Sequence, residues 1–203
     1  RELGLITVID GAHSLGQIPI NMEDINADFY FSNAHKWLCV PKSSAFLFVH
    51  KEAQKLVKPL ITSWGWGKDR SFSTGNDFID MHQWLGTADV TPSLTIPEAL
   101  DFYNKHNWNQ IRNNCHTLLE QYLTKICEIE GFSNCYSQSD SYKQMAVIRI
   151  PDHLDSKELQ LKLFNNFKIE IPVQDWENMK LMRISVQAYN TEDDLLKLYE
   201  SLR

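Results

Sequence analysis

The sequence predicts an α/β fold, and three observations support this. Short apolar runs separated by short connections fill the first 50 residues, and strand-like and helix-like segments alternate after Gly131. Hydrophobic residues make up 43% of the 203 positions and charged residues 23%, which is enough apolar side chain for a core. Strands alternating with helices are typical of a sheet that carries helices on its faces.

Three strands and a helix are predicted at the start of the chain. Residues 3–9 are short and apolar, and the turn-forming pair Asp10-Gly11 closes them. The other segments are two further strands and a polar helix: residues 28–32, 44–49 and 51–57. Strands this apolar predict a sheet that is buried on both faces.

The segment from Thr62 to Pro92 has a different character. Aromatic residues alternate with glycines there without a helical or strand period: Trp64, Trp66, Phe72, Phe78 and Trp84, with Gly65, Gly67, Gly75 and Gly86. A loop of this length inside a domain is usually functional or disordered. The many aromatic side chains argue against disorder, so we expect an ordered, functional loop.

The rest of the chain alternates helices and strands. We expect a helix after Pro97, an amphipathic helix over residues 108–129, strands over 145–150, 169–173 and 182–186, and helices over 156–167 and 191–202. Asp155 or Ser156 can cap the first of the last two helices, and Asn190 or Thr191 the second. We place a domain boundary near residue 107, which divides the chain into 1–106 and 107–203.

Composition excludes several classes of protein. The net charge is -6 without a local Lys/Arg cluster, so we expect no nucleic acid and no anionic membrane as partner. The four cysteines and seven histidines show no metal-ligand spacing, so we expect no metal site and a reducing compartment, the cytoplasm. The chain enters an apolar run directly after Arg1, without a methionine, so we expect it to be a fragment.

Two residues indicate a site at one edge of the sheet. Asp10 ends a predicted strand and Lys36 follows a later one, so both lie at the carboxyl edge, where α/β proteins bind ligands. A carboxylate beside a lysine suits pyridoxal phosphate, because the amine forms a Schiff base and the carboxylate keeps the pyridine nitrogen protonated. By itself the spacing also fits a turn aspartate and a surface lysine.

Four motifs in order resemble the class V aminotransferase family of fold-type I pyridoxal-phosphate enzymes, in its isopenicillin N epimerase-like branch. They cover nearly the whole chain: Asp10-Gly11-Ala12-His13 with Gly16-Gln17 and Ala27-Asp28-Phe29-Tyr30, then His35-Lys36-Trp37-Leu38 with Pro41-Lys42, then Gly86-Thr87, and finally Arg183-Ile184-Ser185 with Tyr189-Asn190-Thr191. The resemblance implies that 1–106 is the C-terminal part of the cofactor-binding large domain. It implies that 107–203 is a linking helix and a small α+β C-terminal domain.

The resemblance also implies roles for single residues. Lys36 would be the Schiff-base lysine and the base for the substrate α-proton, and Asp10 would pair with the pyridine nitrogen. Around them, His13 would lie near the ring hydroxyl, Asn33 and His35 would hold the phosphate, and Thr87 would reach the phosphate in a neighbouring subunit of a homodimer. Arg183 would clamp the carboxylate of an amino-acid substrate, which suits its planar fork.

The reaction stays open at this point. The resemblance is compatible with an epimerase, an aminotransferase or a C–S/β-lyase, because one fold hosts many reactions. Cysteine desulfurases of the family need a loop cysteine before the arginine, and no cysteine follows Cys135. The alternative is a truncated, non-catalytic paralogue that serves dimerisation or partner binding. The fragment alone is expected to be inactive.

Overall fold

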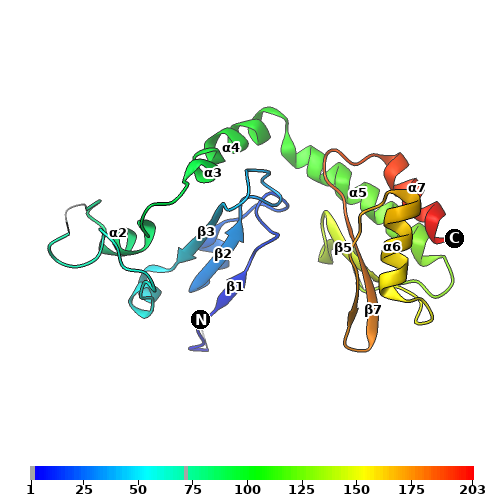
Figure 1. Cartoon of the computed structure of the whole chain (residues 1–203), viewed down its shortest axis with the longest axis horizontal. Helices are drawn as coiled ribbons and strands as arrows, with labels where there is room; N and C mark the ends of the chain where they lie inside the picture. Colours follow the sequence, from blue (N-terminus) through cyan, green and yellow to red (C-terminus); the bar gives the residue numbers. More distant parts are fainter. Residues whose placement is uncertain (1–2, 71–72) are drawn as a thin grey trace. The chain divides into compact units, whose positions relative to one another are not determined.

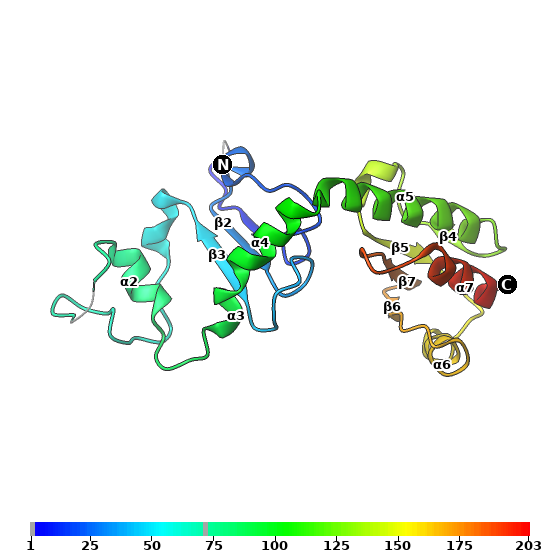
Figure 2. The same cartoon turned by 90° about the horizontal axis from the view of Figure 1, so that it is seen from above.

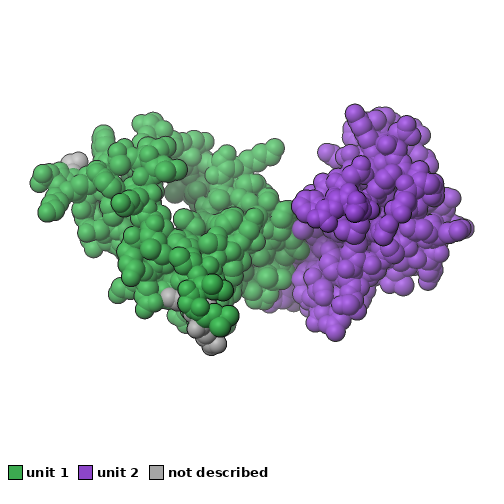
Figure 3. All heavy atoms as spheres, turned by 90° about the horizontal axis from the view of Figure 1, so that it is seen from below, with its two compact units in different colours: residues 1–103 green, residues 104–203 purple. Residues whose placement is uncertain are grey.

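The computed structural model describes residues 3–70 and 73–203, so Arg1 and Phe72 lie outside the described residues. It has the predicted α/β character, and the chain divides into two compact units, residues 1–103 and 104–203 (Figure 3). The assignment of 1–106 and 107–203 to two domains stays a prediction.

The first unit contains a three-stranded sheet in the order β1-β2-β3 (Figure 1). Strand β1 (Val8–Asp10) runs parallel to β2 (Phe29–Asn33), and β3 (Ala45–Val49) runs antiparallel to β2. All three strands were predicted, although the first is shorter than residues 3–9. Before the strand, the Thr7 amide and hydroxyl donate to the Asp28 carboxylate, and the Thr7 carbonyl accepts from the Phe29 amide.

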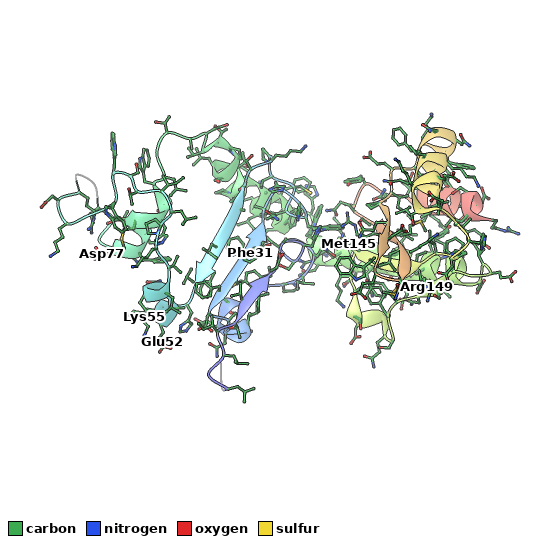
Figure 4. All side chains as sticks on the ribbon, turned by 60° about the horizontal axis from the view of Figure 1, so that its bottom comes forward. Phe31, Glu52, Lys55, Asp77, Met145 and Arg149 are labelled. Atoms are coloured by element: carbon green, nitrogen blue, oxygen red, sulfur yellow. The ribbon has the colours of Figure 1, made fainter. Side chains whose placement is uncertain are left out.

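The expectation of a sheet buried on both faces is wrong for this chain. Val8 is 63% exposed and Leu47 53%, and Phe31 of β2 (labelled in Figure 4) is 36% exposed. The apolar run before β1 is exposed as well, with Leu3 at 85%. Among residues 3–70 and 73–203 no element covers these side chains, so the apolar pattern marks a face that this chain leaves open.

Short helical turns precede β2 and follow β3. Helix α1 (Met22–Ile25) lies between β1 and β2, and the Asn21 side chain caps it by accepting from the Glu23 amide. The polar helix predicted after β3 is the 3-10 helix η1 (Lys51–Leu56), which His50 caps through its ring nitrogen.

The segment predicted as a long loop, Thr62 to Pro92, contains helix α2 (Asp77–Gln83), and helix α3 (Thr91–Leu94) begins at its end. Helix α2 begins where the Asn76 side chain accepts from the amides of Phe78 and Ile79. Capping of this kind stabilises a helix by about 1 kcal/mol. The Asn76 cap therefore favours a helix here although the sequence has no helical apolar period. The prediction of a loop over this whole segment was wrong at α2, whereas residues 62–70 are irregular as expected.

Helix α4 (Ile96–Lys105) is the predicted helix around Pro97, and it lies beside the end of the sheet where β2 ends (Figures 1 and 2). Ile96, Ala99 and Tyr103 pack on a small core of Ala34, Leu38 and Val40. The Tyr103 hydroxyl donates to the Trp37 carbonyl, which ties α4 to the segment after β2.

The second unit is a four-stranded antiparallel sheet in the order β4-β5-β7-β6, with helices on one face. Its elements are α5 (Trp108–Cys127), β4 (Ser133–Asn134), η2 (Ser139–Ser141), β5 (Met145–Arg149), α6 (Ser156–Phe167), β6 (Val173–Trp176), β7 (Met179–Ser185) and α7 (Glu192–Leu202). Asp155 caps α6 and Thr191 caps α7, so one of each pair of predicted caps is confirmed.

One strand of this unit was misplaced. The structure puts β6 at Val173–Trp176, where residues 169–173 were predicted, and β7 begins three residues before the predicted 182. Glu177, with φ 51°, lies in the tight turn that joins the two strands. Ile171 is buried in the core, so its apolar character reflects packing of the segment before the hairpin.

One continuous core holds the second unit together. It combines α5, α6 and α7 with the inner face of the sheet, and Leu119, Ile126, Ile148, Leu163 and Met182 are fully buried in it. The strands alternate between this face and an open face, as expected for an antiparallel sheet covered on one side. Across residues 3–70 and 73–203, the structure contains no helix that is both long and apolar enough to span a membrane.

Candidate active site

The carboxyl ends of β1 and β2 form the edge that carries the predicted site. Because the two strands are parallel, their last residues, Asp10 and Asn33, lie at the same edge of the sheet. The segment from Ala34 to Cys39 follows directly and contains His35 and Lys36. The first two motifs, around Asp10 and Lys36, therefore lie at one edge of the sheet.

The loop after β1 is shaped by the sheet beneath it. The Gly11 amide donates to the Phe31 carbonyl (2.9 Å), and the Ala12 amide donates to Asp10 Oδ1 (2.9 Å). A side chain at Gly11 would collide with the Tyr30 hydroxyl, so the close approach favours glycine at this position. Asp10 itself is exposed, and no hydrogen bond is found for its Oδ2 among the described residues.

The Lys36 amine lies beside His13. Lys36 Nζ is 3.4 Å from His13 Nε2, and the Trp37 indole N–H donates to His13 Nδ1 over 3.1 Å. All three side chains are at least partly buried. The turn that presents Lys36 closes with a bond from the Cys39 amide to the Lys36 carbonyl (3.3 Å), and Cys39 adopts a left-handed backbone with φ 61°.

The residues predicted to hold the phosphate differ in their surroundings. His35 is half-buried, and its Nδ1 lies 3.0 Å from the Ser44 carbonyl, so Nδ1 carries the hydrogen. Asn33 is half-buried at the end of β2. Thr87 is exposed and lies far along the chain, after α2. The structure thus groups Asn33 and His35 with Lys36 along the chain and leaves Thr87 on a separate, exposed segment.

Arg183 belongs to the second unit. It lies on β7 opposite Val147 of β5, and the neighbouring residues Met182 and Ile184 point into the core. Arg183 therefore lies on the open face of that sheet. It lines a cavity of about 110 Å³ with Val147, Pro172, Gln174 and Leu181. Its Nε is buried and has no hydrogen-bond partner among the described residues.

A guanidinium with a buried, unpaired N–H is costly to leave unsatisfied. A carboxylate ligand would satisfy it, because the planar fork of arginine matches two carboxylate oxygens. This orphaned donor is the observation that fits Arg183 to an anionic substrate group.

Two networks were missed from sequence. Trp37 was seen only as part of a motif, although its indole contacts His13. Arg70, for which no role was predicted, forms an ion pair with Asp80 (Nε to Oδ2, 3.0 Å) inside the aromatic segment. Hydrogen bonds from Thr74 and Ser73 are the main causes that lower the pKa of Asp80 to about 2. The sequence signal for this pair is an arginine followed by two aspartates, Asp77 and Asp80, within ten residues.

The groups at the edge of the first sheet match pyridoxal phosphate in chemistry. The cofactor presents an aldehyde, a pyridine nitrogen, a ring hydroxyl and a phosphate. The edge offers an amine, a carboxylate with an oxygen to spare, imidazoles and an amide: Lys36, Asp10, His13, His35 and Asn33. The residues present therefore fit the group that the sequence predicted.

A family model described as aminotransferase class-V matches residues 1–198. The chain belongs to that family. This confirms the resemblance and the cofactor class it carries, pyridoxal phosphate, together with the α/β fold. It does not distinguish among the reactions of the family.

The relatives that resemble this chain are named for different reactions. The isopenicillin N epimerase of Amycolatopsis lactamdurans is 27% identical over 211 residues, covering 100% of this chain and 53% of the relative. An L-cysteine desulfhydrase of Arabidopsis thaliana is 27% identical over 229 residues, covering 100% of this chain and 47% of the relative. The chain thus spans about half the length of these relatives.

A solved structure agrees on the fold. A variant of the cystine C–S lyase C-DES, with glycine covalently linked to its PLP cofactor, superimposes with a TM-score of 0.74 at 14% identity. The match covers 96% of this chain and 50% of that one. At this identity the similarity concerns the fold alone.

Proposed function

We propose that this chain is part of a pyridoxal-phosphate enzyme that acts on a small amino acid, with Lys36 as the residue that holds the cofactor. The observation that carries the proposal is the meeting of Lys36 Nζ and His13 Nε2, 3.4 Å apart, at the sheet edge that also carries Asp10. In a member of the class-V family, the Lys36 amine at that edge is the nucleophile that the cofactor aldehyde requires.

The proposed roles follow from the chemistry of each side chain. Asp10 holds a proton at the pyridine nitrogen with its spare oxygen, and His13 donates toward the ring hydroxyl. Asn33 and His35 bind the phosphate. His35 can donate there only when its ring is doubly protonated, because Nδ1–H is committed to the Ser44 carbonyl. Thr87, exposed after α2, is proposed to reach the phosphate of a second copy in a homodimer.

The chemistry is proposed to begin at the α-carbon. Pyridoxal phosphate, when bound, withdraws electrons from that carbon and weakens its bonds. Lys36 takes the α-proton and returns it, and Arg183 binds the substrate carboxylate. Protonation of the α-carbon from the opposite face would make an epimerase, protonation at the cofactor instead of the α-carbon would make an aminotransferase, and loss of a β-substituent would make a C–S lyase.

The compartment and partners are proposals of the same kind. Cys39, Cys115, Cys127 and Cys135 are all free thiols, which suits a reducing compartment such as the cytoplasm. The non-catalytic alternative is not favoured by any feature of the described residues. A protein used only for docking would have no physical need for Lys36 to face His13, or for an unpaired arginine N–H at position 183.

The test uses the natural, full-length protein saturated with pyridoxal phosphate. Borohydride reduction links the cofactor irreversibly to the amine that holds it, and peptide mapping then locates it. We expect the label on Lys36, none in Lys36→Ala, and full labelling in Lys58→Ala, which removes an exposed lysine. A label elsewhere, or none, would refute the assignment.

A second measurement reads the step shared by all three reactions. Exchange of the α-proton of an amino acid for deuterium in heavy water is followed by NMR across a panel that includes alanine and cysteine. Removal of a general base slows such a step by about 10²-fold or more. Lys36→Ala is therefore expected to slow exchange by at least that factor, and Lys58→Ala to leave it unchanged.

A further inference from the structure

We infer that Trp37 is a positioning residue: its indole N–H fixes which ring nitrogen of His13 carries the hydrogen, and thereby sets what His13 presents to Lys36. The inference deepens the proposed function and rests on it where it concerns Lys36. The part that concerns His13 depends only on the contacts of this chain.

The contact between Trp37 and His13 has only one polarity. An indole N–H donates and never accepts, so the His13 nitrogen 3.1 Å away, Nδ1, must supply a lone pair. A neutral imidazole has one lone-pair nitrogen and one N–H. With Nδ1 accepting, the hydrogen of neutral His13 lies on Nε2, and a free ring would otherwise choose between two forms.

The same constraint decides what faces Lys36. His13 Nε2 lies 3.4 Å from Lys36 Nζ, somewhat beyond the usual hydrogen-bond range of about 2.7–3.2 Å. At this distance it still matters to the Lys36 amine whether Nε2 presents a hydrogen or a lone pair. An ammonium group has three hydrogens and no lone pair, so it gains nothing from an N–H. A neutral amine can accept from it, and the neutral amine is the form that attacks an aldehyde.

Both partners are anchored, so the polarity is built into the fold. The Trp37 carbonyl accepts from the Tyr103 hydroxyl, and a side chain at Gly16 would collide with that carbonyl. The Trp37 side chain is buried, with the whole residue 8% exposed. On the other side, Gln17 Nε2 donates to the His13 carbonyl over 2.8 Å. The backbone at both positions is therefore held in place, and the Trp37 ring is further restrained by its burial and by its bond to His13.

The direct test is the ring protonation of His13 in the natural, full-length protein. Nitrogen-15 NMR of histidine-labelled protein distinguishes protonated from unprotonated ring nitrogens, and His13→Gln identifies which signals belong to His13. We expect a single form with hydrogen on Nε2 in the unmodified protein. In Trp37→Phe, we expect a second form with hydrogen on Nδ1 to appear. An unchanged His13 spectrum in that variant would overturn the inference.

A second substitution separates the hydrogen bond from packing. Benzothienylalanine at position 37 replaces the indole N–H by sulfur at nearly constant shape, so it should reproduce the mixed His13 signals even if Trp37→Phe fails to fold. Trp108→Phe is the matched control, because Trp108 is equally buried at 8% exposure but lies in the other unit. It should leave the His13 signals unchanged.

The effect on Lys36 is read from the rate at which the cofactor-free protein takes up pyridoxal phosphate at Lys36, trapped by borohydride. Loss of one hydrogen bond is expected to slow uptake about fivefold in both position-37 variants and not in Trp108→Phe. Equal rates would refute the role toward Lys36. If the unmodified protein never labels Lys36, the proposed function fails, while the nitrogen-15 spectra still decide the inference about His13.

Discussion

Arg70 and Asp80 form an ion pair, Nε to Oδ2 at 3.0 Å, in which the Asp80 side chain is fully buried. Asp80 also accepts from the Ser73 hydroxyl (2.7 Å) and from the amide and hydroxyl of Thr74 (2.8 and 2.7 Å). Both carboxylate oxygens are therefore occupied. The pair joins the irregular part of the aromatic segment to helix α2, so it holds this segment in one conformation without a hydrophobic core of its own.

The order of the segment should depend on pH through Asp80. Its pKa is lowered from the ordinary value of 3.8 to about 2, chiefly by the hydrogen bonds from Thr74 and Ser73. A lowered pKa in the folded state adds stability above the unfolded value, and this stability is lost as the pH falls through the folded value. We expect deuterium exchange across residues 73–83 to increase between about pH 4 and pH 2.

Two variants make this test specific. Asp80→Asn should raise exchange in the segment at pH 7 and abolish its extra dependence on pH below 4. Asp69→Asn changes a neighbouring exposed carboxylate and should behave like the unmodified protein at each pH. The same pH dependence in Asp80→Asn would show that another group is responsible.

Replacement of Arg183 should weaken substrate binding more than it slows the chemistry. Under the proposed function, Arg183→Leu loses a charge-assisted, two-point contact with the carboxylate, and kcat/KM is expected to fall about 100-fold, mainly through KM. Arg183→Lys retains the charge but not the fork, so it should recover only part of the loss. Full activity in Arg183→Lys would argue against a two-point contact.

Residues 104–203 should fold without the rest of the chain. This unit has a continuous core that joins three helices to one face of a four-stranded sheet. We expect the isolated segment to show cooperative thermal unfolding and dispersed NMR signals. Non-cooperative unfolding would show that the two compact units are not separate domains.

Two leucines on helix α6 provide a matched test of that core. Leu163 is fully buried, whereas Leu161 is 50% exposed two positions earlier. Leu163→Ala should lower the free energy of unfolding by about 2–5 kcal/mol, because it leaves a cavity. Leu161→Ala should change it by about 0.5 kcal/mol or less. Denaturant titrations of both variants measure the difference, and similar values would contradict the assigned packing.

The second unit was largely predictable because its signals are local. Helix α6 has the predicted bounds, and α7 starts one residue after the predicted Thr191, which is its cap. The apolar periodicity of a helix and its capping residue both lie within the helix or next to it in the sequence, so they can be recognised without the structure. The hairpin of β6 and β7 was misplaced because a buried Ile171 before a strand looks like part of the strand.

The candidate site was predictable only as a set of residues. Motif order placed Asp10 and Lys36 at one edge, and the parallel pairing of β1 and β2 supports this. Contacts between residues far apart in the sequence, such as Trp37 with His13, depend on how the loops fold back. The side-chain pairing of Arg70 with Asp80 likewise depends on a helix that apolar periodicity did not reveal.

The hydrogen bond from the Gly11 amide to the Phe31 carbonyl bears on the chemical ageing of the protein. Asp-Gly bonds deteriorate when the glycine nitrogen attacks the aspartate side chain and closes a five-membered ring. A larger residue at position 11 would collide with the Tyr30 side chain and force it to shift, which disfavours replacement of the glycine. The hydrogen bond to β2 holds the Gly11 nitrogen away from this attack. Isoaspartate at position 10 should therefore form only while β1 is separated from β2, and its amount in an aged sample would report how often the two strands separate.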